Sequence, residues 1–162
     1  MNKNPESSFI HRVYRLVVVP GTWLQTPLLL VIRLYWGWQF FQDGKGKLMN
    51  VAKVTEFFRG WHVPFPMFSV YFTGAIQCAC GLLLLVGLAA RLASVPLIFV
   101  MIGAYLTAEI DKVKHIFSDP DKFVTADPFL FMLAALIIFS FGPGKISLDR
   151  LIAGKPRDEG HA

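Results

Sequence analysis

The 162-residue sequence is poor in charged side chains. Asp, Glu, Lys and Arg make up 17% of it, whereas a soluble domain usually carries about 25%. The shortage is local, because residues 63–90, 92–108 and 128–144 contain none of the four. The shortest of these stretches holds 17 residues, and a helix needs about 17 to 25 to cross the hydrocarbon layer of a membrane. The pattern argues against a soluble helical bundle and predicts an integral membrane protein.

Cysteine is also scarce. Cys78 and Cys80 are the only two, and both fall within one apolar stretch. On a helix, positions two apart differ by about 200° around the axis, so the two thiols would point to different faces and could not bridge. The Cys-x-x-Cys pair that four-helix disulfide-generating quinone reductases require is absent. We interpret both cysteines as buried packing residues.

Histidine is missing from every apolar stretch. The four histidines, His11, His62, His115 and His161, fall in connections or tails. A transmembrane haem needs axial ligands inside the bundle, and the glycine–lysine runs lack the spacing of a phosphate loop. We therefore predict no metal site and no covalently or metal-bound cofactor. The sequence shows no interleaved basic and aromatic face for nucleic acid.

A fourth apolar stretch, residues 24–42, is interrupted only by Arg33. Insertion scales assign an arginine at a helix centre a cost of ~2.5–3.5 kcal/mol, which the flanking leucines and aromatics can offset. We therefore predict an all-α fold, an antiparallel bundle of four transmembrane helices within a domain over residues 24–146. The predicted spans are residues 24–42, 67–89, 92–110 and 127–142.

The flanking segments are amphipathic or polar. In residues 1–23, apolar side chains recur at helical spacing opposite basic ones, which predicts a helix in the membrane interface that ends at Pro20-Gly21. Residues 43–62 predict a second interfacial helix, with Trp61 at the headgroup level. Residues 147–162 read as a tail, and no cleavable signal peptide is visible at the start.

Charge counts predict the orientation. With four spans, both termini lie on the side of the Arg91 turn, which holds eight lysines and arginines against seven on the other side. Because basic residues favour the cytoplasmic side, and because the N-terminal segment is short and basic, we expect both termini in the cytoplasm. The expected location is a bacterial inner membrane, crossed several times.

Polar residues within or next to the spans predict a site. Arg33, Gly37 and Gly44 share one face of the first helix, where glycines let a neighbour approach. We expect Arg33 to face the bundle interior near mid-depth, with Gln77 at similar depth and two acids near the outer end. One hypothesis is a cleft open to the outer leaflet that accepts a quinone ring or a lipid tail; the other is that Arg33 only locks helices together. The cleft candidates are Arg33, Lys47, Gln77, Glu109, Asp127, Trp36, Phe40 and Phe72. Catalytic residues remain unassigned.

Three blocks of sequence resemble one family. Residues 33–48 read R-L-Y-W-G-x-x-F-x-x-x-G-x-G-K-L, the run VPFPMFSVYFTGAIQCACGLLLLVGLAARL follows, and FGPGKISLDRLI comes near the end. Together these blocks resemble the DoxX family of small four-helix membrane proteins, over roughly residues 27–152. The opening arginine, glycine and lysine of that pattern correspond to Arg33, Gly37 and Lys47. Gln77 stands where the family pattern commonly has glutamate, which puts a proton or charge role there in doubt.

The resemblance implies a link to membrane redox chemistry. Members include a subunit of a thiosulfate:quinone oxidoreductase and partners of thiol- and superoxide-detoxifying enzymes. We expect an inner-membrane subunit beside a quinone-linked or thiol/sulfur redox partner, without a redox centre of its own and not an enzyme by itself. The expected partners are membrane lipids and other membrane subunits. The alternative is a structural or assembly subunit of a larger complex, and a small-solute carrier is a weaker one because no inverted repeat is evident.

Overall fold

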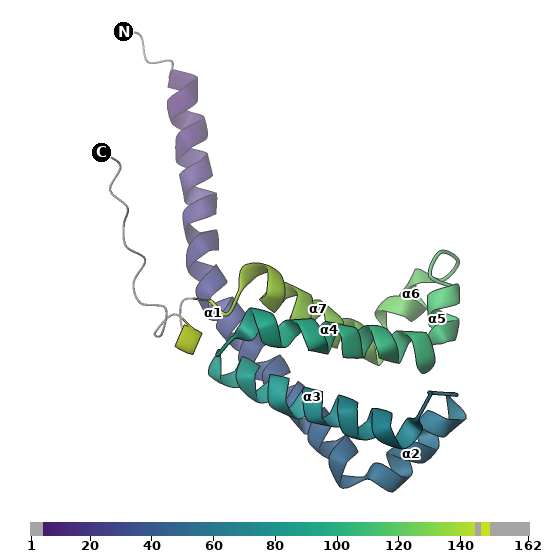
Figure 1. Ribbon diagram of the computed structural model, residues 1–162. Coiled ribbons are helices and arrows are strands. Elements are labelled where there is room, and N and C mark those ends of the chain that lie inside the picture. Colours follow the sequence, from purple (N-terminus) through teal and green to yellow (C-terminus); the bar gives the residue numbers. More distant parts are fainter. Residues whose placement is uncertain (1–4, 145–146, 150–162) are drawn as a thin grey trace.

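The computed structural model describes the backbone of residues 5–144 and 147–149, and side chains within these ranges from residue 23 onward. Over this part of the chain the fold is all-helical, without strands (Figure 1). The helices are α1 (Pro5–Met49), α2 (Val51–Gly60), α3 (Pro66–Val86), α4 (Ala90–Thr107), α5 (Ile110–Lys114), α6 (Pro120–Val124) and α7 (Asp127–Phe141).

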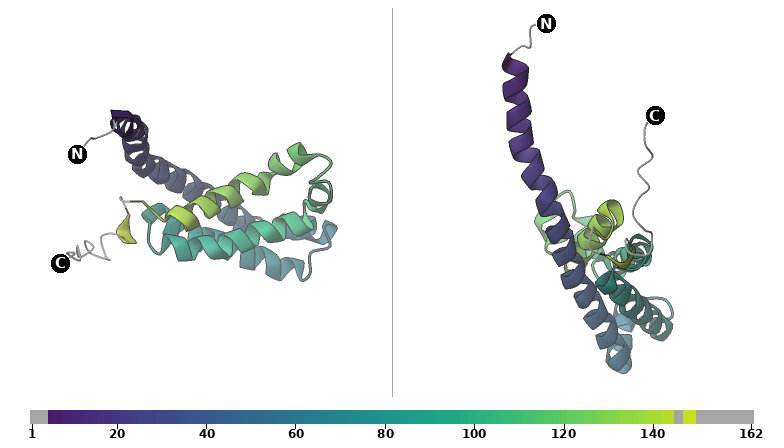
Figure 2. Two further views of the ribbon diagram at one scale, coloured as in Figure 1. Left: turned by 90° about the horizontal axis from the view of Figure 1, so that it is seen from above. Right: turned by 90° about the vertical axis from the view of Figure 1, so that its left-hand side faces the viewer.

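α1 is a single helix of 45 residues, and this corrects the predicted break at Pro20-Gly21. A proline inside a helix removes one hydrogen bond, whereas ending the helix would leave several backbone groups without their helical partners. Residues 43–49, predicted to open a second helix, also belong to α1, so that only α2 remains of the predicted interfacial segment. The first half of α1 extends away from the other helices in both views of Figure 2.

Two helices in the described part of the chain are long and apolar enough to cross a membrane, α3 and α4. They correspond to the predicted spans 67–89 and 92–110. α7 matches the predicted span 127–142, but with 15 residues it is shorter. The structure therefore supports a membrane protein with two candidate spans and a third, shorter apolar helix.

α3 and α4 form the predicted tight hairpin. Gly87 follows α3 with φ 70°, and Ala89 precedes α4 with φ 48°. The left-handed conformation is easy for glycine because it has no β-carbon. The Gly87 N–H donates to the carbonyls of Leu83 and Leu84, which ends α3 with satisfied backbone groups.

α1 and α3 pack backbone to backbone through a glycine seam of Gly37 and Gly44 on α1 and Gly74 and Gly81 on α3. A β-carbon at position 44 would lie 2.7 Å from the Gly74 carbonyl oxygen, and one at position 81 would lie 2.7 Å from the Phe41 nitrogen. Such contacts are tighter than side chains permit, so the glycines allow this close approach. The prediction that glycines narrow one face of the first helix is confirmed.

α4 and α7 pack against each other and complete the bundle (Figure 1). The core between the helices includes Phe40 of α1, Leu84 of α3, Leu97 of α4 and Ile138 of α7, all fully or almost fully buried. Each of these four helices thus contributes one large apolar side chain to a shared interior. The outer surface of the protein keeps many exposed leucines and aromatic residues. Exposed apolar faces on helices α3 and α4 are what a lipid environment requires.

Candidate functional site

A polar group joins α1 to α3, and we call it the α1–α3 polar site: Asp43, Lys47 and Gln77. Lys47 lies one turn after Asp43, and its Nζ is 2.5 Å from Asp43 Oδ2. Gln77 Nε2 donates to the same oxygen at 2.7 Å. The Asp43 side chain is 42% exposed and that of Lys47 19%, whereas Gln77 is fully buried. The site therefore has an open acidic side and a closed amide side.

The depth of this site is unusual for charged groups. Gln77 lies near the middle of α3, about 15 Å from either end at 1.5 Å per residue. Gly44, the neighbour of Asp43 in α1, packs against the backbone of Cys78, which puts the carboxylate at the same level. If α3 crosses a membrane, an ion pair lies close to its midplane, where charges are rare and mark functional positions.

The two cysteines flank this site on different sides of α3. The Cys78 thiol donates to the Phe41 carbonyl of α1 at 3.7 Å. Cys80 is buried among core residues that include Phe40 and Leu84. Both thiols are free, so the prediction that they do not pair with each other is confirmed.

Arg33 is buried, as predicted, but it lies at a different depth and meets different partners. Its Nη1 donates to the Pro143 carbonyl, in the loop after α7, at 2.8 Å. A β-carbon at Gly87, between α3 and α4, would lie 2.5 Å from the same nitrogen. Arg33 therefore sits at the end of the bundle where α3 turns into α4. The expectation that Arg33 lies at mid-depth with Gln77 is wrong. In the register that the glycine seam sets, Gly44 of α1 lies level with Gln77, and Arg33 lies about three helical turns before it.

The closing motif of the sequence surrounds this arginine. The Asp149 carboxylate accepts hydrogen bonds from the Ala89 and Ala90 N–H groups, at 2.5 and 3.1 Å, and so caps α4. The Asp149 N–H donates to the Gly87 carbonyl at 3.0 Å, and its charge attracts Arg33. We call Arg33, Gly87, Pro143 and Asp149 the Arg33 junction. Its contacts are those of a structural lock between α1, the α3–α4 turn and the C-terminal loop.

The two outer acids lie at the other end of the bundle. Asp127 begins α7, and Pro143 follows the end of that helix, so about 20 Å separates them at 1.5 Å per residue. Glu109 precedes α5 and pairs with Lys112 at 3.0 Å. The structure therefore does not bring either acid to Arg33, and the cleft that would have joined them is not formed.

The three aromatic residues predicted to line the cleft do not all lie together. Trp36 and Phe40 pack edge-on against Phe131 of α7, with ring centroids 5.0 and 4.9 Å from it. Phe72 points outward and stacks on Phe68 at 5.7 Å. The first two rings are packing residues between α1 and α7, and the third lies on the outer face of α3. Of the eight cleft candidates, the structure brings Lys47 and Gln77 together through Asp43, and Trp36 and Phe40 together through Phe131.

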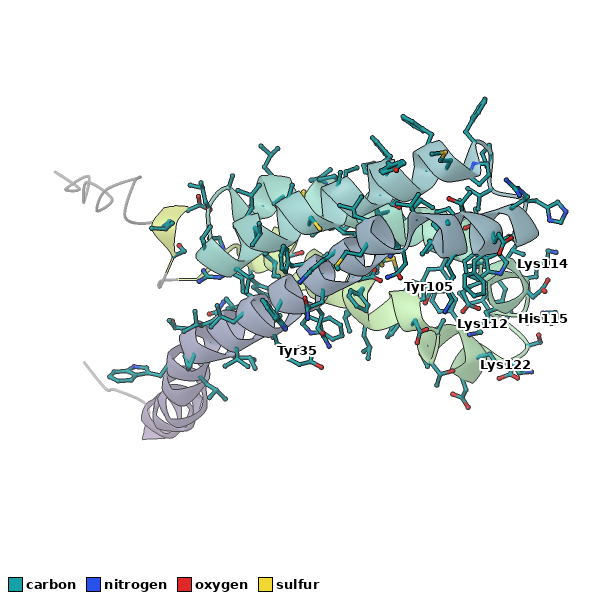
Figure 3. All side chains as sticks on the ribbon, turned by 90° about the horizontal axis from the view of Figure 1, so that it is seen from below. Tyr35, Tyr105, Lys112, Lys114, His115 and Lys122 are labelled. Carbon is teal, nitrogen blue, oxygen red and sulfur yellow. The ribbon has the colours of Figure 1, made fainter. Side chains whose placement is uncertain are left out.

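The connection from α4 to α7 carries most of the remaining charges. Figure 3 shows Lys112, Lys114, His115 and Lys122 around α5 and α6. Three ion pairs there join residues three apart, as in Lys122–Asp119 at 2.9 Å. The hydrogen bond from Lys122 lowers the pKa of Asp119 and correspondingly raises the pKa of Lys122. Such exposed local pairs stabilise a fold little, and the described residues contain no group of three His, Cys, Asp or Glu suited to a metal ion.

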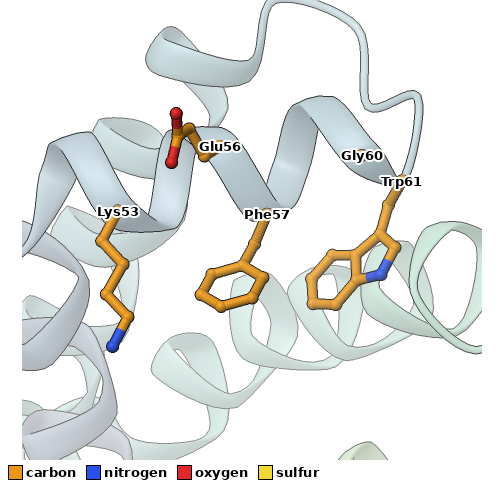
Figure 4. Close-up of a pocket in the computed structure, with 5 residues that line it drawn as sticks. All are labelled: Lys53, Glu56, Phe57, Gly60 and Trp61. Carbon is orange, nitrogen blue, oxygen red and sulfur yellow. The ribbon is translucent and has the colours of Figure 1, made fainter.

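A hollow of about 430 Å³ lies along α2 (Figure 4), lined by Lys53, Glu56, Phe57, Gly60 and Trp61. The rings of Phe57 and Trp61 stack with centroids 6.1 Å apart, and α2 has no buried residue. This hollow contains none of the predicted site residues. Its lining is aromatic with one basic and one acidic side chain, and the interfacial position of α2 stays a prediction.

Sequence reasoning missed two residues, Asp43 and Asp149. Asp43 precedes Lys47 by four positions, a spacing that predicts an ion pair on a helix, and this signal was available. Asp149 lies in the closing motif, but its contact with the start of α4 spans 60 residues of sequence. No local pattern reveals such a contact.

Comparisons with known proteins identify a family of membrane proteins. The chain matches the family model described as DoxX over residues 28–110. It is 30% identical over 139 residues to "Uncharacterized membrane protein Rv3486" of Mycobacterium tuberculosis, an alignment that covers 78% of this chain and 82% of that protein. It is 29% identical over 117 residues to "Putative oxidoreductase CatD" of Bacillus subtilis, covering 63% and 86%. No solved structure matches the chain.

Proposed function

The chain belongs to the DoxX family of membrane proteins, and we propose that it is a four-pass inner-membrane subunit that works beside a quinone-linked or thiol/sulfur redox partner. In this proposal the chain carries no redox centre, and its α1–α3 polar site contacts the ring of a quinone or a lipid molecule. The partner supplies the electron chemistry, and this chain supplies a place in the membrane for the lipid-soluble molecule.

The four-pass arrangement has support from the packing. α3 and α4 are long enough to span, and α7 packs along α4. The second half of α1 runs beside α3 through the glycine seam, from Gly37 to Gly44. A helix held against a spanning helix over this length shares its membrane environment. Both termini in the cytoplasm follow from the excess of basic residues on their side.

The Asp43–Lys47 ion pair of α1, level with the middle of α3, is the observation that carries the redox role. A protein that only needed stability could carry apolar side chains at this depth, where charged side chains are costly and mark functional positions. Lys47 Nζ can donate to a quinone carbonyl, which only accepts hydrogen bonds. The exposed edge of Asp43 lets a molecule that diffuses in the bilayer reach the site without opening the bundle. The name of the similar CatD protein, "Putative oxidoreductase", is a second support.

Quinone binding by the purified protein in lipid nanodiscs tests the proposal. A short-tailed benzoquinone should bind the parent, and Lys47→Met should weaken binding roughly tenfold, the worth of one charge-assisted hydrogen bond. Lys45→Met is the matched control, because Lys45 is exposed on the same helix outside the site, and its affinity should equal that of the parent.

Mass spectrometry of proteins that co-purify in mild detergent tests the partner. We expect a thiol, sulfur or quinone oxidoreductase among them. Absence of quinone binding, together with stable co-purification with a large complex that contains no redox enzyme, would instead establish the alternative of a structural or assembly subunit.

A further inference from the structure

Gln77 holds one buried acceptor that nothing in the described structure satisfies. Its side chain is 0% exposed, its Nε2 donates to Asp43 Oδ2 at 2.7 Å, and its Oε1 has no hydrogen-bond donor among the described residues. A buried acceptor without a donor carries the full free-energy penalty of its desolvation. Such groups are rare in folded proteins, and each needs a specific explanation.

The amide cannot relieve this cost by turning over. Asp43 is paired with Lys47 at 2.5 Å, and an ionised carboxylate only accepts hydrogen bonds. Turning the amide would set Oε1 of Gln77 against Oδ2 of Asp43, two acceptors in contact. Asp43 therefore holds the N–H side of the amide toward itself and keeps Oε1 directed away, ready for a donor from elsewhere.

We infer that the α1–α3 polar site binds the hydroxyl group of a membrane-soluble molecule, whose hydrogen donates to Gln77 Oε1 and whose oxygen accepts from Lys47 Nζ. This inference rests on the proposed function and deepens it by naming the form of the ligand. A hydroxyl group at this depth can come from a quinol ring or from a lipid such as diacylglycerol. An oxidised quinone ring offers carbonyl groups in place of these hydroxyls, and a carbonyl leaves Oε1 without its donor.

Entry of the hydroxyl requires Lys47 to move. Gln77 has no exposed surface, whereas the neighbouring Lys47 side chain is 19% exposed and Asp43 42%. The lysine stem is flexible and its ammonium group can turn its three donors between partners. The ligand therefore enters along Asp43 and displaces Lys47 enough to reach the amide, while the carboxylate keeps the amide in place.

The inference predicts that the site distinguishes the reduced from the oxidised ring. Sites built to bond a hydroxyl discriminate against analogues that lack it, because a buried group is then left unpaired. We expect the short-tailed quinol to bind roughly tenfold more tightly than its quinone. Gln77→Met removes the acceptor at similar side-chain length, and should make the two affinities equal.

The experiment measures three affinities in nanodiscs under anaerobic conditions: the quinol, the quinone and a short-chain diacylglycerol. The matched control is Gln39→Met, since Gln39 is an amide of α1 whose Nε2 bonds Tyr35 Oη at 3.2 Å, outside the site, and it should keep the preference for the quinol. Asp43→Asn is the second variant: an asparagine amide both donates and accepts, so Gln77 can turn and the preference should fall. Thermal unfolding of each variant confirms that it is folded.

The outcomes separate the inference from the proposed function. A quinol preference that disappears in Gln77→Met supports both. Equal binding of quinone and quinol, or a preference that survives Gln77→Met, overturns the inference while the quinone role stands. Gln77-dependent binding of diacylglycerol alone supports a hydroxyl site and removes the quinone from the proposed function. No binding of any of the three overturns the inference together with the quinone contact.

Discussion

Arg33 and Gly87 depend on each other where α1 meets the α3–α4 turn. The arginine reaches the Pro143 carbonyl across the space that a β-carbon at position 87 would occupy, 2.5 Å from Nη1. Gly87 also has φ 70°, which other residues rarely adopt. This glycine therefore serves the turn and the arginine at once, and the arginine contacts the Pro143 carbonyl and is attracted by the charge of Asp149.

Gly87→Ala should destabilise the protein by about 1–3 kcal/mol, because the new methyl group meets both the strained backbone conformation and the guanidinium. The measurement is the thermal or denaturant midpoint in detergent. Gly46→Ala is the control: Gly46 is helical, and its β-carbon would meet nothing within 4 Å, so stability should stay equal or rise slightly. Equal loss in both variants would show that the junction is not the cause.

At the scale of elements, the pairing of α1 with α3 depends on the four glycines of the seam. The contacts of Gly44 are the closest, because its β-carbon would lie 2.6 Å from the Cys78 nitrogen. Backbone atoms cannot step aside as a flexible side chain can. An added methyl group must therefore push the two helices apart, and with them Asp43 and Gln77.

Gly44→Ala should cost about 1–3 kcal/mol, the usual penalty of overpacking, and should also abolish the preference for a quinol, since the Asp43–Gln77 hydrogen bond would lengthen. Unfolding midpoints and ligand affinities in nanodiscs measure the two effects. Gly103→Ala in α4 is the matched control because its β-carbon would lie in open space. A Gly44→Ala variant as stable as the parent would contradict the seam's role.

The elements also show how far sequence reasoning reaches. Charge-free runs located α3, α4 and α7 to within a few residues, because hydrocarbon permits few charges over a helix length. The predicted break at Pro20-Gly21 is wrong, since local propensity does not weigh the several backbone hydrogen bonds that ending a helix removes. The depth of Arg33 was also wrong, because the seam decides which turn of α1 meets which turn of α3. The contact between Lys47 and Gln77 through Asp43 depends on this same register, so local sequence patterns do not predict it.

For the whole molecule, the predicted orientation puts both termini in the cytoplasm and the α5–α6 connection outside. Single cysteines at Ser7 and Arg157, in a background without Cys78 and Cys80, should resist a membrane-impermeant thiol reagent in intact cells. A single cysteine at Asp121 should react. Labelling after permeabilisation is the control for reactivity, and labelling of Ser7 and Arg157 alone in intact cells would reverse the orientation.

The hydrogen bond of Arg33 to Pro143 has a consequence for biosynthesis, because its two residues are 110 positions apart. At the usual rates of translation, roughly 5 to 20 residues per second, the carbonyl is made about 5 to 20 s after the arginine. In the proposed four-pass arrangement, α1 enters the bilayer while its cation still lacks this acceptor. In that arrangement the aqueous boundary lies near the end of α3 where Arg33 sits, and the long side chain can reach it during the interval. In the same arrangement, an arginine one or two turns closer to the bilayer centre would lie in hydrocarbon during that interval. The order of synthesis therefore favours an arginine near the end of the helix bundle.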